Sequence, residues 1–208
     1  FFSTLFTLTS HHPYKVPDRY KDVFKEGRIE IHKSIRYSDY ALKRFFETIK
    51  KMPWYNNTLF VLVADHTSLT DDPFYLNKVG NNTIPLLFFK PGSDLKGMNS
   101  TIAQQIDIMP SVLDYLDYPS PYFSFGNSVF DTTKTHFAFT MNNSYQLIEG
   151  DYSLTFNGTD ATELYELKDS SLSKNVIAIE KQVKDRMERK AKAILQTYQQ
   201  RLINNRMH

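Results

Sequence analysis

Two uninterrupted apolar runs mark the first half of the chain. The first forms the centre of Asn57–His66, and the second is Ile84–Phe89, which ends in Lys90-Pro91-Gly92. Continuous apolar runs of this length are typical of strands buried on both faces of an α/β sheet. In open α/β sheets the chemistry lies where the strands end. We therefore expect functional groups directly after the first run, at Asp65 and His66.

Helical periodicity appears in three other segments. Residues 27–51 form the first predicted helix, with apolar positions three, four and seven residues apart at Ile35, Leu42, Phe46 and Ile49. Residues 101–116 predict a second helix, in which Pro110 implies a kink or a late start. Residues 174–205 predict one long helix with an apolar side made of Val176, Val183, Met187, Ile194, Tyr198 and Leu202. Its basic side is interpreted as solvated, with binding to an anionic membrane as the alternative.

Alternating patterns predict a small antiparallel region later in the chain. Strands are expected over 136–140, 145–149 and 152–156, with a hairpin turn at 141–144. Near the start, residues 6–10 predict the tail of a strand that runs into a loop at His11-His12-Pro13, because proline keeps the preceding residue extended. Strands and helices thus alternate as in an α/β architecture.

Composition narrows the class of protein but does not identify it. The chain has 208 residues and is 41% hydrophobic, which is enough for a substantial core. Its net charge of +2 gives no argument for a nucleic-acid partner. It contains no cysteine, which excludes disulfides and thiolate metal sites. No stretch approaches the roughly 20 apolar residues of a membrane span.

Asp65 and His66 form a candidate metal site. Neighbouring side chains on a strand point to opposite faces, so both can meet one ion only if the backbone leaves the strand there. The polar, proline-terminated segment 67–73 allows that exit. A carboxylate with an imidazole suits Mn²⁺ or Zn²⁺ better than Ca²⁺ or Mg²⁺. The alternative is an aspartate that caps a turn beside a surface histidine.

Four segments in order resemble one known family. They are residues 8–14, residues 37–42 with Phe45-Phe46, the strand that ends at Asp65-His66, and residues 84–92 followed by 105–113. Together they resemble the C-terminal half of the sulfatase-like domain of the alkaline phosphatase superfamily, in particular phosphoglycerol transferases of the lipoteichoic acid synthase type. The family usually has glycine where this chain has Thr67.

The resemblance implies roles for three residues. Asp65 and His66 would be two of four metal ligands, with Mn²⁺ as the first expectation and Zn²⁺, Mg²⁺ or Ca²⁺ as alternatives. His11, in the family's Ser-x-His-x-Pro-aromatic pattern, would be a catalytic histidine near the transferred phosphate, whereas His12 occupies a variable position and receives no role. The family's nucleophilic threonine and a glutamate ligand belong upstream, and the sulfatase motif Cys-x-Pro-x-Arg is absent from the chain.

The resemblance also implies an architecture. The expected fold is α/β, the C-terminal half of an alkaline phosphatase-like α/β/α sandwich with a small antiparallel β subdomain and a long C-terminal helix. The expected parts are residues 1–130, the half-domain; 131–170, the β subdomain; and 171–208, the amphipathic helix. Since the chain opens on a strand-like segment without an initiator methionine, we expect half of a catalytic domain, inactive by itself, whose partner is the missing N-terminal half.

The expected function is part of a metal-dependent phosphoglycerol transferase or sulfatase-like phosphodiesterase. Its substrates would be phospholipids or glycans of the bacterial cell envelope, outside the cytoplasm, with membrane attachment through upstream helices. A sulfatase or a phosphoethanolamine transferase is the enzymatic alternative. A non-catalytic interaction domain with a retained fold is the alternative from another class. The aromatic, proline-interrupted segment 118–125 is interpreted as a covering loop that borders a substrate groove or simply packs.

Overall fold

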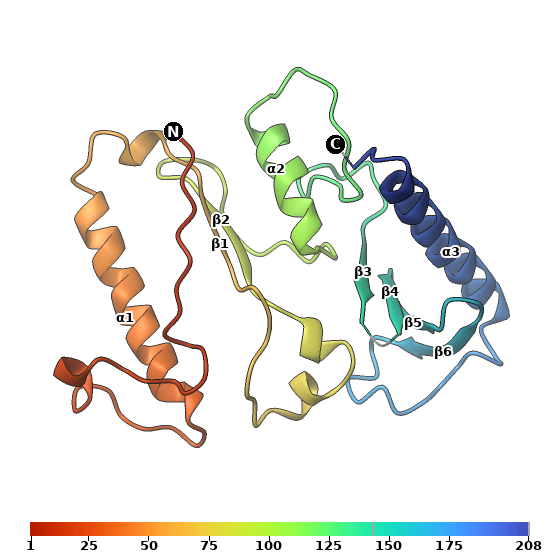
Figure 1. Ribbon diagram of the computed structural model, residues 1–208, viewed down its shortest axis with the longest axis horizontal. Coiled ribbons are helices and arrows are strands. Elements are labelled where there is room, and N and C mark those ends of the chain that lie inside the picture. Colours follow the sequence, from red (N-terminus) through yellow and green to blue (C-terminus); the bar gives the residue numbers. More distant parts are fainter. Residues whose placement is uncertain (143, 208) are drawn as a thin grey trace. The chain divides into compact units, whose positions relative to one another are not determined.

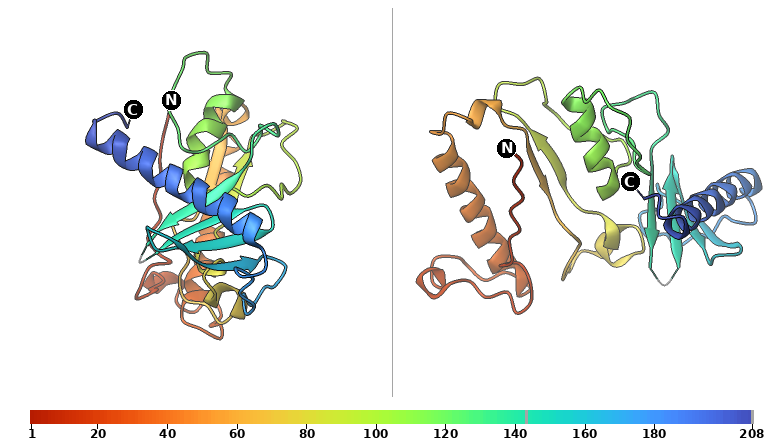
Figure 2. Two further views of the ribbon diagram at one scale, coloured as in Figure 1. Left: turned by 90° about the vertical axis from the view of Figure 1, so that its right-hand side faces the viewer. Right: turned by 45° about the horizontal axis from the view of Figure 1, so that its top comes forward.

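A computed structural model of the chain describes residues 1–142 and 144–207. The chain divides into two compact units, residues 1–97 and residues 98–208. Figures 1 and 2 show the helices and strands of each unit. The functional domain boundaries predicted from the sequence stay a prediction.

The first unit combines one helix with a two-stranded sheet. Helix α1 spans Ile31–Ile49, strand β1 spans Phe60–Val63 and strand β2 spans Leu86–Phe89. The strands are antiparallel, with Phe60 opposite Phe89 and Val63 opposite Leu86. Short 3₁₀ turns lie at Asp18–Tyr20, Tyr55–Asn57, Pro73–Leu76 and Gly80–Asn82. Phe46 of α1 packs edge-on against Phe60 and Phe89, which fixes the helix on the sheet.

Helix α1 is shorter than the sequence pattern predicted. The segment before it folds back along the helix, because the guanidinium of Arg36 donates hydrogen bonds to the carbonyls of Lys25 and Glu26. Gly27 lies so close to His32 that a Cβ atom there would be 2.3 Å from the histidine ring. The helix therefore begins at Ile31, four residues after the expected start.

The prediction that both apolar runs are buried on both faces is wrong for the described residues. The observed strands have four residues each, and Val63 and Leu87 are 42% and 54% exposed. The predicted strand tail at 6–10 is also wrong, since residues 1–8 have no assigned secondary structure and Phe6 is 65% exposed. An apolar run shows only that a strand is hydrophobic. Burial of both faces also requires neighbouring layers of structure, and this unit does not supply them.

The second unit is a four-stranded antiparallel sheet with two helices. Its strands are β3 Phe137–Met141, β4 Tyr145–Glu149, β5 Tyr152–Phe156 and β6 Ala161–Glu166, in the spatial order β3-β4-β5-β6. The three predicted strands are confirmed to within one residue. The predicted turn includes Asn143, which lies outside the described residues. Strand β6 was not predicted, because its sequence contains two glutamates and lacks a long apolar run.

Helix α3, Lys181–Ile203, lies along one face of this sheet (Figures 1 and 2). Its buried face follows a spacing of four residues through Met187, Ala191 and Leu195, and it packs against Leu147, Leu154, Phe156 and Leu164. The predicted apolar side included Met187 but not Ala191 or Leu195, and it placed Leu202 inward, although that residue is 56% exposed. The helix begins seven residues later than expected, because the carboxylate of Asp169 accepts backbone hydrogen bonds that hold 171–174 in a turn.

Ion pairs occupy much of the basic side of α3. Arg186 and Lys190 contact Glu149 of β4, whose side chain is 6% exposed. Lys184 and Lys192 pair with Glu188, at 2.7 and 2.5 Å. These cations are thus bound within the unit and not simply solvated. In the described residues, every helix is too short or too polar to cross a membrane.

Helix α2, Ile108–Tyr115, begins late, as Pro110 predicted. It follows a 3₁₀ turn at Gln105–Asp107. Asp107 lies at the start of the helix but does more than complement its dipole. Its buried carboxylate accepts the N–H of Gln104 at 2.9 Å and the N–H of Asn127 at 2.8 Å. Burial raises the pKa of Asp107, and these two hydrogen bonds oppose that rise.

Replacing Leu154 with alanine should unfold the second unit more easily. The side chain is fully buried between the sheet and α3, so its loss leaves a cavity that costs about 3 kcal/mol of the free energy of unfolding. Chemical denaturation measures this value. The matched control is Leu202→Ala on the exposed side of α3, expected to change stability by less than about 0.5 kcal/mol. Equal costs for the two variants would contradict the described core.

Acid should break the ion pairs of Glu188 with Lys184 and Lys192 and so lower the stability of the second unit. Hydrogen bonds from Lys184 and then Lys192 lower the pKa of this carboxyl to about 2 from its ordinary value of 4.5. Its contribution to stability is therefore complete above pH 4.5 and is lost as the pH falls through about 2. Unfolding free energies measured across this range should show a smaller slope in Glu188→Gln. Glu47→Gln, on the exposed side of α1, should retain the slope of the unmodified chain.

Candidate metal centre

The chain leaves the strand just before the candidate ligands. The last ladder contact is the N–H of Ala64 donating to the carbonyl of Pro85 at 3.4 Å. The N–H of His66 donates to the Oδ1 atom of Asp65 at 3.0 Å and not to a neighbouring strand. Residues 65–72 contain no assigned strand or helix. The two side chains are therefore released from the alternation that would point them to opposite faces.

Asp65 and His66 turn their donor atoms toward each other. The Nε2 atom of His66 lies 3.5 Å from Oδ2 of Asp65, and the side chains are 68% and 54% exposed. On the other side of the ring, Nδ1 lies 2.5 Å from the carbonyl of Thr67. A carbonyl can only accept, so in the neutral ring the proton is on Nδ1 and Nε2 carries the free lone pair.

This arrangement fits two ligands of one metal ion. Ligand distances near 2.1 Å and a donor separation of 3.5 Å give an angle of about 113° at the ion, close to tetrahedral. A backbone carbonyl that holds the second ring nitrogen is the usual support for a metal-binding histidine. Two ligands are an incomplete shell, and within residues 1–142 and 144–207 no group of three or more acidic, histidine or cysteine side chains could hold an ion.

His11 lies in a tight turn closed by its own backbone. The N–H of Tyr14 donates to the carbonyl of His11 at 2.8 Å. The Nδ1 atom of His11 lies 2.8 Å from the carbonyl of His12, which leaves Nε2 open in an exposed side chain. Just before the turn, the hydroxyl of Ser10 contacts that of Ser38 at 3.1 Å and so ties the segment to α1.

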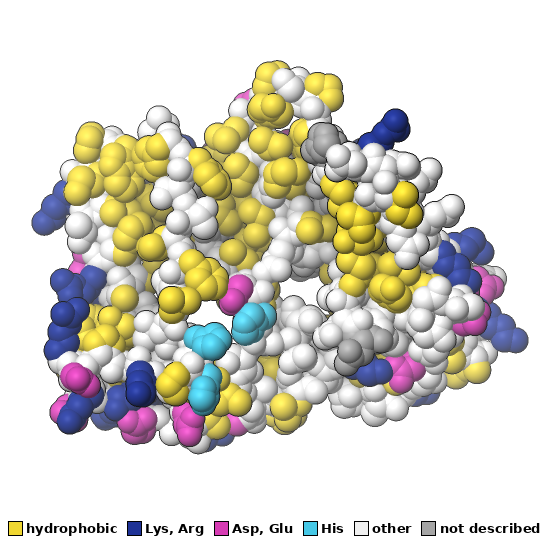
Figure 3. All heavy atoms as spheres, in the orientation of Figure 1, with side chains coloured by type: hydrophobic (Ala, Val, Ile, Leu, Met, Phe, Trp, Pro, Cys, Tyr) yellow, Lys and Arg dark blue, Asp and Glu magenta, His cyan; other side chains and the backbone are white. Residues whose placement is uncertain are grey.

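A side-chain hydrogen bond joins the His11 turn to the loop that carries the Asp65-His66 pair. The hydroxyl of Tyr14 lies 3.1 Å from the Oγ atom of Ser68. The same loop is tied to the rest of the unit by Arg28, whose Nε atom lies 2.8 Å from Asp71. Figure 3 shows histidine side chains gathered on one face next to an acidic side chain. The structure thus brings together the neighbourhoods of all three candidate residues.

Sequence reasoning placed Thr67 and Ser68 in the segment where the chain leaves the strand, and Tyr14 in the histidine pattern, but it did not predict their contacts. Tyr14 is the aromatic residue of the Ser-x-His-x-Pro-aromatic pattern, so its position was visible but its partner 54 residues away was not. Thr67 contributes through its backbone, and its hydroxyl donates to the carbonyl of Asn81 at 2.5 Å. No residue pattern encodes such contacts, since they depend on how the two loops meet.

The chemistry available here combines an anionic oxygen with open imidazole nitrogens. Asp65 and Nε2 of His66 can donate electron pairs to a cation, and Nε2 of His11 can accept a proton or, once protonated, donate one. The exposed positions of all three leave room for a ligand. Such a set is suited to a phosphate or sulfate ester, whose oxygens carry the negative charge that a cation and a protonated histidine stabilise.

Comparisons with curated proteins identify relatives of two named activities. Lipoteichoic acid synthase 1 from Bacillus subtilis (strain 168) is 26% identical over 148 residues, which are 62% of this chain and 23% of that protein. An arylsulfatase from Clostridium perfringens (strain 13 / Type A) is 28% identical over 109 residues, 49% of this chain and 23% of that protein. The chain therefore spans about a quarter of the length of these relatives.

Solved structures share the fold at low sequence identity. A lipoteichoic acid synthase from Listeria monocytogenes has a TM-score of 0.68 at 16% identity, over 92% of this chain and 52% of that one. A protein of the alkaline phosphatase superfamily from Vibrio parahaemolyticus has a TM-score of 0.63 at 22% identity, over 79% and 41%. These likenesses confirm the predicted fold class.

The family model of sulfatases matches residues 1–118, which is more than half of the chain and includes His11, Asp65 and His66. The chain therefore belongs to the sulfatase family and has the α/β fold of the alkaline phosphatase superfamily, with a small antiparallel sheet and a long C-terminal helix.

Proposed function

We propose that this chain is part of a metal-dependent phosphoglycerol transferase or sulfatase-like phosphodiesterase that acts on lipid or glycan substrates of the cell envelope. The observation that carries the proposal is the convergence of Nε2 of His66 and Oδ2 of Asp65, 3.5 Å apart, beside the loop that Tyr14 links to His11. The curated relatives named lipoteichoic acid synthase support the transferase assignment and its location in the envelope.

In this proposal Asp65 and His66 hold a divalent cation. Mn²⁺ is the first candidate and Zn²⁺ the second, because imidazole is a softer ligand than Ca²⁺ or Mg²⁺ prefers. When bound, the cation would stabilise negative charge on the phosphoryl or sulfuryl oxygens. Thr67 orients His66 through its carbonyl and leaves Nε2 on the side of the ring that faces Asp65.

His11 would act on the transferred group. Protonated at Nε2, it would donate a hydrogen bond to a phosphoryl oxygen, or transfer its proton to the leaving alkoxide as the phosphorus–oxygen bond breaks. Its Nδ1 contact with the carbonyl of His12 holds the ring in one orientation. The turn closed by Tyr14 holds the backbone behind the ring, so the imidazole approaches the substrate on a fixed support.

The rest of the catalytic domain is the proposed partner of the first unit. Apolar side chains that a finished core would cover are exposed there, at Phe1, Phe2, Leu5, Phe6, Val63 and Leu87. Hydrophobic side chains are prominent on the face in Figure 3 over α1 and the two strands. We expect the missing ligands and the nucleophile on that additional segment, with membrane attachment through helices upstream of it. The solved synthase chain, about twice as long as its matched part, supports this arrangement.

A sulfatase is the second candidate. The arylsulfatase relative from Clostridium perfringens favours it. In this proposal a sulfatase would differ from the transferase in the nucleophile, in the number of metal ions and in the ester that is cleaved. Assays with a phosphodiester and with an aryl sulfate on the complete protein separate them.

Removing either proposed ligand should abolish metal binding in the complete protein. Asp65→Ala and His66→Ala each delete one of two converging donors, and the metal affinity is expected to fall by at least about 100-fold. Metal content by elemental analysis and phosphodiesterase activity are measured on the same samples. Asp22→Ala removes an exposed carboxylate elsewhere in the first unit and is the control. Full metal content in both ligand variants would refute the assignment.

Replacing His11 should lower turnover and leave the metal in place. His11→Ala removes a proton donor that contributes about 10²–10⁴-fold to general acid catalysis. The comparison is His12→Ala, which removes the adjacent imidazole but keeps the backbone carbonyl that supports His11. Both kcat and metal content are measured. Loss of metal in His11→Ala would make His11 a ligand, and equal activities of the two variants would exclude the proposed role.

A further inference from the structure

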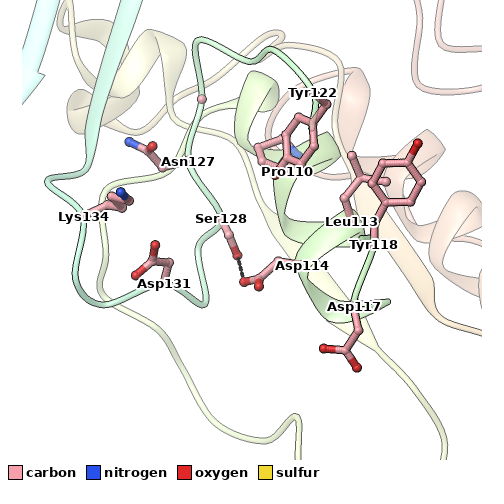
Figure 4. A pocket seen from close by; sticks show the side chains of 11 residues that line it. Pro110, Leu113, Asp114, Asp117, Tyr118, Tyr122, Asn127, Ser128, Asp131 and Lys134 are labelled. Carbon is pink, nitrogen blue, oxygen red and sulfur yellow. Dashed lines mark hydrogen bonds between the residues drawn. The ribbon is translucent and has the colours of Figure 1, made fainter. Parts of the chain in front are cut away.

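A cavity in the second unit has no role in the proposed chemistry. It lies between α2, the segment that follows the helix, and residues 126–134 (Figure 4). Its volume is about 270 Å³, which is close to the lower limit of roughly 300 Å³ for small-molecule sites. This size suits one small ring-shaped ligand and is too small for an acyl chain with its headgroup.

The two walls of the cavity differ in chemistry. Pro110, Leu113, Tyr118 and Tyr122 form an apolar and aromatic side, as Figure 4 shows. Asn127, Asp131 and Lys134 form a polar side, and Asp114 lies between the two with its carboxylate hydrogen-bonded to the hydroxyl of Ser128. The tyrosine rings are about half exposed, with centroids 6.4 Å apart. A ligand therefore meets flat carbon surface on one side and hydrogen-bonding groups on the other.

Hydrogen bonds hold the polar wall in place before any ligand arrives. Asp107 accepts the N–H of Asn127, and the buried hydroxyl of Ser111 accepts the N–H of Val129 at 3.0 Å. Directly before Asn127, Gly126 lies so close to the backbone of the preceding turn that a Cβ atom would be 2.4 Å from the carbonyl oxygen of Ile106. A preformed wall favours binding, because less conformational entropy is lost.

The charge of the lining discriminates between ligands. The lining carries three carboxylates and one ammonium group, from Asp114, Asp117, Asp131 and Lys134. The side chain and backbone of Thr133 donate to Asp131 and lower its pKa, so this carboxylate stays ionised. An anionic group, including a phosphate, is repelled by such a lining. The carboxylates also fail to converge on a cation, since no metal-binding group of three or more occurs among the described residues.

We propose that this cavity binds one sugar ring of a glycan that carries no negative charge at that ring. The carbon–hydrogen face of a pyranose would pack on Tyr118 and Tyr122. Its hydroxyls would donate to Asp114 and Asp131 and accept from Asn127. An amino sugar gains further attraction from the excess of carboxylates. The site stands on the geometry of the second unit and requires neither the metal pair nor His11.

Binding of small sugars to the full chain tests this proposal. The probes are glucose, glucosamine and glucose 6-phosphate, which share a ring and differ in charge, and the measurement is a titration followed by NMR. Glucose and glucosamine are expected to bind in the millimolar range, and glucose 6-phosphate about ten-fold more weakly. Equal or tighter binding of glucose 6-phosphate, or no binding of any sugar, would overturn the proposal.

Variants of the aromatic wall locate the binding. Tyr122→Ala is expected to weaken glucose binding about ten-fold, whereas Tyr122→Phe keeps the ring and most of the affinity. Tyr75→Ala, an exposed tyrosine of the first unit, is the matched control. Thermal unfolding verifies that the variants are folded. Unchanged binding in Tyr122→Ala and Tyr118→Ala would place the sugar elsewhere and refute the site.

The charge of the cavity has its own test. Asn tolerates positive φ better than most residues, so Asp117→Asn removes a carboxylate at a position with φ of 51° without a new backbone strain. This variant should reduce the preference for glucosamine over glucose, and an unchanged preference would contradict the charge argument. Metal content should stay constant in all of these variants, which separates failure of this proposal from failure of the metal site.

Discussion

The aromatic contact between Phe46, Phe60 and Phe89 is the interaction on which the first unit depends. The Phe46 ring lies 5.3 Å from Phe60 and 5.8 Å from Phe89, centroid to centroid, while Phe60 and Phe89 stack at 6.0 Å. It joins α1 to both strands at the start of β1. Asp65 lies two residues beyond the end of β1, so the contact sets where the candidate ligands emerge. A helix that shifted on the sheet would also move Ser38, which is tied to the His11 turn through Ser10.

The same strands show that the unit needs a further layer. Val63 and Leu87 point to opposite faces of the pair, and both are substantially exposed. A two-stranded sheet covered by one helix cannot bury both faces of apolar strands. The exposed side chains of Phe1, Phe2, Leu5 and Phe6 add to this surface. In the proposed function the pair Asp65 and His66 also needs further ligands, so additional protein beside β1 would complete both the core and the metal shell. The greater length of the relatives fits this proposal.

Local patterns in the sequence predicted elements better than they predicted layers. The hairpin strands and α1 follow from periodicity, which depends only on neighbouring residues. The register of α3 was less well predicted, because Ala191 carries little hydrophobic signal although its small side chain permits close packing on the sheet. In the candidate site, Asp65 and His66 are adjacent, so their proximity needed no tertiary information. The contact of Tyr14 with Ser68 did need it, since it joins two loops whose meeting depends on the whole unit.

Asp107 connects helix formation to the sugar-sized cavity. Its carboxylate is 2% exposed, and it holds the turn before α2 together while it anchors the N–H of Asn127. The side chain of Gln104 extends the connection to β3 by accepting the N–H of Phe139 at 3.0 Å. The match to the sulfatase family ends at residue 118, so α2 lies within it while Tyr122, Asn127 and Asp131 lie beyond it. Helix α2, which lies inside the matched segment, therefore supports a cavity wall made of residues outside that segment. Specificity is commonly built this way, with variable loops held by a rigid element of the fold.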